Sequence, residues 1–157
     1  MGEILDVAIS FFREDEWSFT QLEGQQALRI GFQGENGQWS CYAQAREEQA
    51  QFLFYSVCPV KAPEDRREAV AEFLTRANYG LFIGNFELDF SDGEIRYKTS
   101  IDVVGDRLSA GLVKPLVYAN VLMMDRYLPG IMSVIYGNVP PAEAVAKAEG
   151  ISGQAED

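Results

Sequence analysis

The side chains whose types and spacing come nearest to a catalytic arrangement lie in FELDFSDGEIRYK, residues 86–98. Glu87 and Asp89 are two positions apart, and paired carboxylates can act as a general acid and a general base. The Asp-Gly pair between the two halves is typical of a two-residue hairpin turn, which sets both acids opposite cations on one exposed face. Such pairing lowers carboxylate pKa values and mainly fixes strand register. We therefore interpret the residues as two register salt pairs: Glu87 with Lys98, and Asp89 with Arg96.

Few other side chains could serve as nucleophiles or metal ligands. The 157 residues include no histidine, which excludes His-based catalytic triads and His-ligated metal sites. Cys41 and Cys58 lie in the strand-like runs WSCYA and FYSVC, where a lone cysteine is usually a small buried hydrophobe. Two cysteines without histidine do not supply the four ligands of a structural zinc site. We therefore predict no catalytic residue, no metal ligand and no cofactor.

Length and charge limit the class of protein. A chain of 157 residues suits one domain, which we expect over residues 1–150, followed by a flexible acidic tail at 151–157. The formal net charge of -11 repels the phosphates of nucleic acid and of anionic membranes. The N-terminus lacks the basic and apolar regions of a secretion signal, and no segment has 18 apolar residues in a row. We expect a soluble, cytoplasmic protein with no nucleic-acid partner and no membrane insertion.

The elements that position these side chains follow from the spacing of apolar residues. Residues 3–14 show helical spacing, and the run FLFYSVCPV is typical of a strand in the middle of a sheet. Asn36-Gly37 predicts a two-residue hairpin turn in which Phe32 pairs with Cys41. With the hairpin at 86–98, these elements predict an α+β fold: an antiparallel sheet with helices on one face.

The segment from Ser109 to Tyr136 predicts a long helix with apolar residues on two faces. Pro129 and Gly130 should kink or interrupt it. A helix buried on both faces in so small a domain suggests that the sheet covers one face and a second subunit covers the other. We therefore predict a homodimer. The candidate dimer or partner surface consists of Val117, Val121, Met124, Leu128, Ile131 and Met132.

Several longer stretches carry a resemblance to a known family. AEFLTRANYGLFIGNFELDFSDGEIRYKTSI and DRYLPGIMSVIYG resemble the YbjN family, also described as bacterial sensory transduction regulators, whose fold is that of type III secretion chaperones. The resemblance covers about residues 3–148. It implies an α-β-β-β-α-β-β-α domain that is dimeric, and it brings no catalytic residues with it.

Two functions remain open from the sequence. The first, which we favour, is a non-enzymatic, dimeric protein-interaction or chaperone-like module that holds a client protein against sheet faces or apolar grooves. The alternative is a small-molecule carrier, or an unrecognised enzyme, with an aromatic-lined cavity between sheet and helix. The candidate lining of that cavity is Tyr42, Phe54, Tyr79 and Tyr118.

Overall fold

A computed structural model describes residues 2–150, so the tail predicted at 151–157 lies outside the described residues. The strands form one antiparallel, 6-stranded sheet in the order β1-β2-β3-β4-β6-β5. The helices are α1 (Glu3–Glu14), α2 (Arg67–Tyr79), α3 (Ala110–Tyr136) and α4 (Pro141–Ala148), and the strands are β1 (Phe19–Gln21), β2 (Ala27–Gln33), β3 (Gln38–Arg46), β4 (Gln51–Val57), β5 (Asn85–Leu88) and β6 (Ile95–Asp102).

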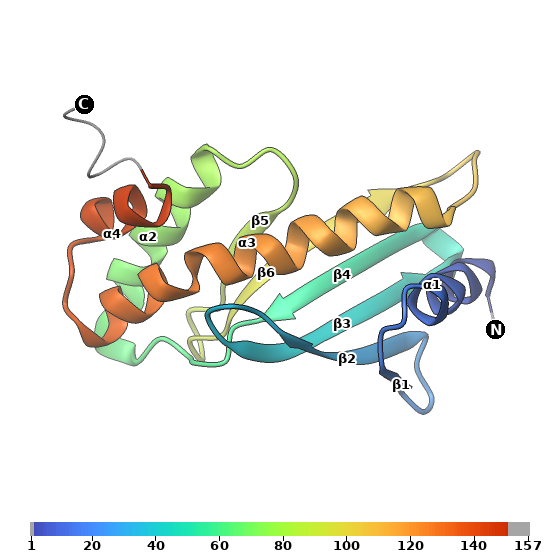
Figure 1. Ribbon diagram of the computed structural model, residues 1–157, viewed down its shortest axis with the longest axis horizontal. Helices are drawn as coiled ribbons and strands as arrows, with labels where there is room; N and C mark the ends of the chain where they lie inside the picture. Colours follow the sequence, from blue (N-terminus) through green and yellow to red (C-terminus); the bar gives the residue numbers. More distant parts are fainter. Residues whose placement is uncertain (1, 151–157) are drawn as a thin grey trace.

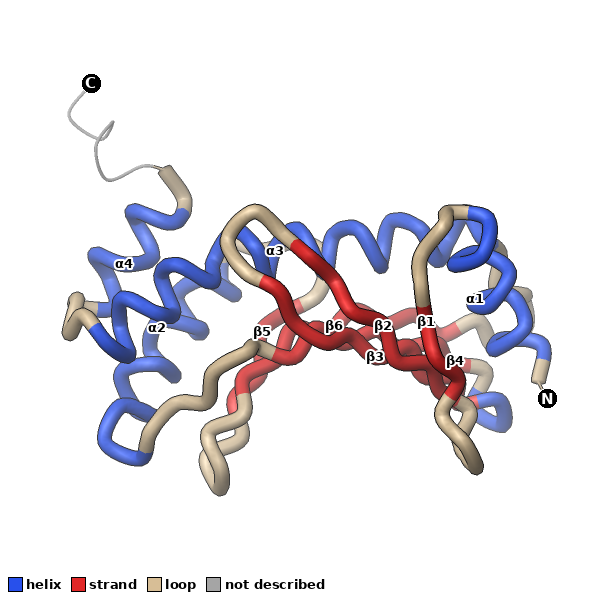
Figure 2. The backbone as a smooth tube through the Cα atoms, turned by 60° about the horizontal axis from the view of Figure 1, so that its bottom comes forward, coloured by secondary structure: helices blue, strands red, loops and turns tan. Residues whose placement is uncertain are grey.

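The helices cover one face of the sheet. Helix α3 lies along the sheet, in nearly the same direction as β3 and β4, α1 packs at one end, and α2 and α4 pack together at the other end (Figure 1). In Figure 2 the opposite face of the strands has no helix over it, and we call it the open face. The predicted α+β class, with an antiparallel sheet and helices on one face, is therefore confirmed.

Alternation along the strands decides which side chains reach the core. In β4, Phe52, Phe54 and Ser56 are buried under the helices, while Leu53 and Tyr55 are only half-buried on the open face. β4 lies between β3 and β6, as its apolar run predicts. The core under the helices also takes Leu5 and Phe12 from α1 and Phe73 from α2.

Helix α3 continues past its second proline to Tyr136, so of the predicted kink or interruption at Pro129 the interruption is wrong. A proline inside a helix leaves the carbonyl four residues earlier without its usual amide donor. Here that carbonyl belongs to Asp125, and the side-chain amide of Asn36 donates to it at 2.9 Å. The partner from the β2–β3 turn thus offsets part of the cost of the proline. Gly130 is needed next to it because a Cβ there would lie 2.6 Å from the ring of Phe73.

Both hairpins differ from the predicted register by two residues. In the first, Phe32 pairs with Trp39 instead of Cys41, because the connection is Gly34–Gly37 and not Asn36-Gly37 alone. Asp125 fixes this longer turn: its carboxylate accepts from the backbone N–H of Glu35 at 3.0 Å and of Asn36 at 2.8 Å. A slip of two residues keeps every side chain on its predicted face.

The second hairpin has a longer connection for a local reason. The carboxylate of Asp89 accepts from the backbone N–H and the hydroxyl of Ser91, at 2.9 and 2.6 Å. The backbone N–H of Gly93 also donates to the carbonyl of Asp89. Arg96 therefore lies opposite Glu87, and the predicted pairing of Asp89 with Arg96 is wrong.

Helix α1 obtains its N-cap from a distant residue. The position before it is Gly2, which has no side chain to cap the helix. Glu47, in the short 3-10 turn after β3, supplies both carboxylate oxygens instead. They accept from the backbone N–H of Ile4 at 3.1 Å and of Leu5 at 2.9 Å. A negative charge at the N-terminus of a helix is also favourable to the helix dipole.

Candidate functional site

The proposed dimer surface on α3 is not a surface in this structure. Val117, Val121, Met124 and Ile131 have no exposed area, and Leu128 is 2% exposed. Only Met132 is half-buried. Helices α1, α2 and α4 of the same chain also contact α3, whereas its other apolar stripe stays partly open, with Leu112 and Leu122 41% and 54% exposed. The assignment of these residues to an interface is therefore wrong.

The four residues predicted to line an internal cavity do not come together. Phe54 is fully buried between the sheet and the helices. Tyr42 points from β3 to the open face, and Tyr79 is 96% exposed at the end of α2. Tyr118 is on α3, and its hydroxyl donates to Asp15 at the end of α1 at 2.5 Å. The predicted lining between sheet and helix is therefore also wrong.

The charged residues of β5 and β6 form one cluster on the open face. Glu87 accepts from Arg96 Nε at 2.6 Å and pairs with Lys98 Nζ at 2.8 Å, so one carboxylate holds two cations. Partial burial alone would raise the pKa of Glu87, but the bonds from Lys98 and Arg96 keep it below its ordinary value. This carboxylate stays ionised near neutral pH and is no general acid.

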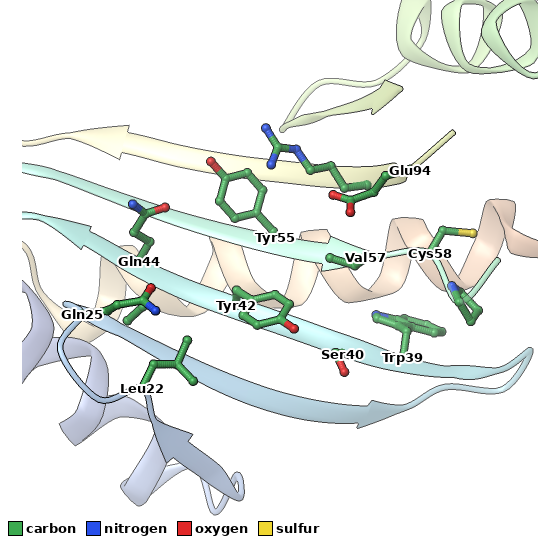
Figure 3. Close-up of a pocket in the computed structure, with 13 residues that line it drawn as sticks. Leu22, Gln25, Trp39, Ser40, Tyr42, Gln44, Tyr55, Val57, Cys58 and Glu94 are labelled. Atoms are coloured by element: carbon green, nitrogen blue, oxygen red, sulfur yellow. The ribbon is translucent and has the colours of Figure 1, made fainter. Parts of the chain in front are cut away.

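A depression of about 650 Å³ lies beside this cluster on the open face. Figure 3 shows Tyr42 and Tyr55 at its centre, on neighbouring strands, with α3 behind the sheet. The two tyrosines face each other in register between β3 and β4. Apolar and polar side chains surround them, among them Leu22, Gln25, Ser40, Gln44, Val57 and Glu94.

Arg96 forms one wall of the depression and is held in place by two contacts. Its guanidinium lies over the ring of Tyr55, 4.3 Å from the ring centroid, while its Nε is bonded to Glu87. Such a cation–π contact is favourable and restricts the rotation of the long side chain. The terminal nitrogens make no hydrogen bond to the described residues and remain available to a ligand.

A second exposed feature is the loop between α2 and β5. Tyr79 and Phe82 are 96% and 97% exposed, and Ile83 is 52% exposed. Two anchors hold this loop. The side chain of Asn78 donates to the carbonyl of Phe86 at 3.1 Å and accepts from its N–H at 2.7 Å. The hydroxyl of Tyr97 donates to the carbonyl of Ile83 at 2.5 Å.

The sequence signal for this loop is its lack of charge, which the spacing of apolar residues does not reveal. Residues 77–86, ANYGLFIGNF, carry no charge in a chain that is 24% charged. Connections between a helix and a strand lie on the surface and usually contain charged or polar residues. An uncharged connection with aromatic residues is therefore unusual. The open-face depression had no comparable signal, because only the pairing of strands shows which tyrosines become neighbours.

Within the described residues, the resolved pKa shifts all move the titratable groups away from neutral pH. Burial raises the pKa of the Cys41 and Cys58 thiols to about 11, so both stay protonated. Burial also raises the pKa of Tyr97 to about 12. Bonds from Ser91 lower the pKa of Asp89, away from neutral pH. Within residues 2–150, no cluster of three metal-ligating side chains occurs.

Comparisons with known proteins agree on the family and the fold. A family model named YbjN, with the description "Putative bacterial sensory transduction regulator", matches residues 5–132. The chain is similar to the crystal structure of "YbjN, a putative transcription regulator from E. coli", with a TM-score of 0.60 and 14% identity over 87% of this chain and 95% of that one. No curated protein matches the sequence.

Two secretion-related structures share the fold at low sequence identity. The ExsC–ExsE complex matches with a TM-score of 0.55 and 10% identity, over 82% of this chain and 96% of that chain. The Yersinia pestis type III secretion chaperone SycH, solved with a fragment of YscM2, matches with a TM-score of 0.51 and 10% identity, over 76% and 95%. None of the helices within the described residues has the length and hydropathy to span a membrane.

Proposed function

The chain belongs to the YbjN family, and from that premise we propose that it is a non-enzymatic protein-binding module that acts as a homodimer. The observation that carries the proposal is the exposed aromatic loop between α2 and β5. An isolated exposed apolar side chain is common, whereas two aromatic rings almost fully exposed in one short loop are typical of an interaction site. Phe82 and Tyr79 are such a pair.

A second copy of the chain is the partner that suits this loop. Two molecules that each carry a net charge of -11 repel each other over most of their surfaces. The uncharged stretch at 77–86 is a place where they approach without setting like charges together. In a twofold dimer the same patch lies on both sides, so Phe82 of each copy packs near the other copy's loop. The anchors at Asn78 and Tyr97 hold the loop in position before the partner arrives, which lowers the entropic cost of association.

The fold and its titratable groups support a binding role over a catalytic one. The protein-binding part of the proposal takes its partner class from the similar structures, two of which are complexes with protein partners. Both cysteines are free, which suits a reducing compartment, so we expect a cytoplasmic location.

Sedimentation velocity over a range of protein concentrations tests the dimer. We expect the wild type to form dimers at micromolar concentration and Phe82→Asp to remain monomeric with an unchanged circular dichroism spectrum. Phe90→Asp is the matched control, because Phe90 is also exposed but lies in the β5–β6 turn; it should dimerise as the wild type does. A monomeric wild type at high micromolar concentration would refute the dimer.

Native mass spectrometry of the protein enriched from its own host tests the binding role. A stoichiometric polypeptide that remains attached under gentle conditions is the expected result. A reproducible small-molecule mass, without any polypeptide, would overturn the proposal in favour of a ligand carrier.

A further inference from the structure

The open face of the sheet differs in charge from the rest of the molecule. The chain as a whole has 24 acidic and 13 basic residues. On the open face the cations and carboxylates are instead balanced. The cations are Arg29, Arg46, Arg96 and Lys98, and the carboxylates are Glu87 and Asp102 on the strands and Asp89 and Glu94 just beyond their ends. The net negative charge therefore belongs to the other surfaces, and an anionic group meets less repulsion on the open face than elsewhere.

Within this face, Arg96 is the cation that is held in a fixed position and still has nitrogens free to bind a ligand. Lys98 is already paired with Glu87, and Arg46 donates to Gln51 at 2.8 Å. Arg96 uses only Nε for Glu87, and its ring contact with Tyr55 holds the guanidinium plane over the depression. A guanidinium fixed in this way with two free terminal nitrogens suits a carboxylate, which it can bind through two parallel hydrogen bonds.

The floor of the depression adds an apolar component. Tyr42 and Tyr55 lie side by side, and Val57 continues the strip along β4. The side chains of Gln25, Ser40 and Gln44 at its margin make no hydrogen bond that the described residues provide. A volume of about 650 Å³ lies in the range of sites that bury a drug-sized ligand. Its lining comes from the neighbouring strands β3, β4 and β6, so an extended segment can lie against it.

We propose that this depression binds an extended segment of a partner protein, with an acidic side chain on Arg96 and a neighbouring aromatic or aliphatic side chain against Tyr42 and Val57. The inference deepens the proposed protein-binding function and rests on it, since it names the site and the chemistry of the client. Glu94 lies in the same depression and opposes the carboxylate, so it tunes the affinity downward. A nucleic acid is disfavoured as occupant because its successive phosphates would face Glu87, Glu94 and Asp102.

The experiment uses an array of short fluorescent peptides in which Asp or Glu stands next to Tyr, Phe or Leu. Each peptide has a partner in which Asn or Gln replaces the acid, and fluorescence anisotropy gives the affinity for the full-length protein. We expect the acidic member of the best pairs to bind more tightly. Arg96→Gln should weaken that binding about tenfold, because a charge-assisted, bidentate contact is lost. Glu94→Gln should strengthen it roughly threefold, because a like charge is removed.

Arg76→Gln is the matched control. It removes the same charge from the exposed surface of α2, where Arg76 pairs with Glu72, and the affinity should stay unchanged. The inference is overturned if no peptide binds, if amide and acid peptides bind equally, if Arg76→Gln weakens binding as much as Arg96→Gln, or if a single-stranded oligonucleotide binds in their place. Phe82→Asp separates the two proposals: a monomeric variant that keeps the Arg96-dependent affinity supports this site independently of the dimer, whereas an intact dimer without peptide binding refutes this site alone.

Discussion

Removal of the Glu47 cap on α1 tests directly how much this distant residue contributes to the free energy of unfolding. Glu47→Ala deletes two hydrogen bonds, at 3.1 and 2.9 Å, to the first turn of a helix that has no other side-chain cap. Loss of an N-cap costs about 1 kcal/mol, and loss of the charge at the helix N-terminus costs about 0.5 kcal/mol more. We therefore expect the free energy of unfolding to fall by about 1.5 kcal/mol.

Urea unfolding measures this change as a lower midpoint at an unchanged slope. Glu48→Ala is the matched control, because Glu48 is the next residue in the same turn and caps no helix; its effect should stay within about 0.5 kcal/mol. Equal effects of the two substitutions would refute the capping role of Glu47.

A second substitution, Gly2→Ser, makes the test sharper because it should destabilise the wild type but stabilise the Glu47→Ala variant. A Cβ on Gly2 would lie 1.9 Å from Cδ of Glu47, so Gly2→Ser should destabilise the wild type. In the Glu47→Ala background that clash is gone, and a serine at the N-cap position supplies a local acceptor. There Gly2→Ser should recover roughly 0.5 to 1 kcal/mol. The same sign in both backgrounds would contradict the geometry.

Two further predictions concern the core and the response to acid. Val117→Asp should give an unfolded chain by circular dichroism and not a folded monomer, because Val117 has no exposed area and an unpaired buried carboxylate costs several kcal/mol; a folded monomer would contradict this. Hydrogen bonds from Tyr118 and Trp17 lower the pKa of Asp15 below 3.8 in the folded protein. Asp15 therefore adds stability that is present above that pH and lost as the pH falls through the folded pKa. The difference in urea midpoint between the wild type and Asp15→Asn should shrink as the pH is lowered below 3.8; a constant difference would refute this.

The sequence predicted the elements and their faces well because both depend on local spacing. Helix 3–14 and the central position of β4 follow from that spacing. The lengths of the two hairpin turns could not be predicted in this way, because they depend on hydrogen bonds made by Asp125 and Ser91. Asp125 lies almost ninety positions beyond the turn it fixes, and no local pattern contains that information.

The functional sites were harder to predict for a related reason. The two apolar faces of α3 predicted burial on both sides, but only the stripe that contains Val117, Val121 and Met124 is fully buried, and Leu112 on the other stripe is 41% exposed. The elements in contact with α3 are the sheet and α1, α2 and α4 of the same chain. Likewise Tyr42, Tyr55 and Arg96 become neighbours only through the pairing of β3, β4 and β6. β4 and β6 are separated in sequence by α2 and β5, so the depression could not be recognised before the sheet order was known.

The bond between Asn78 and Phe86 has a consequence for how far association can proceed. β5 is the last strand of the sheet, and the N–H and C=O of Phe86 point away from β6. An edge with such groups free is a template on which strands of further molecules can add without limit. Because one amide side chain occupies both groups, the sheet cannot be prolonged at that point. A second molecule therefore cannot add a strand at Phe86, and contacts at this edge have to be made by the side chains of the neighbouring loop.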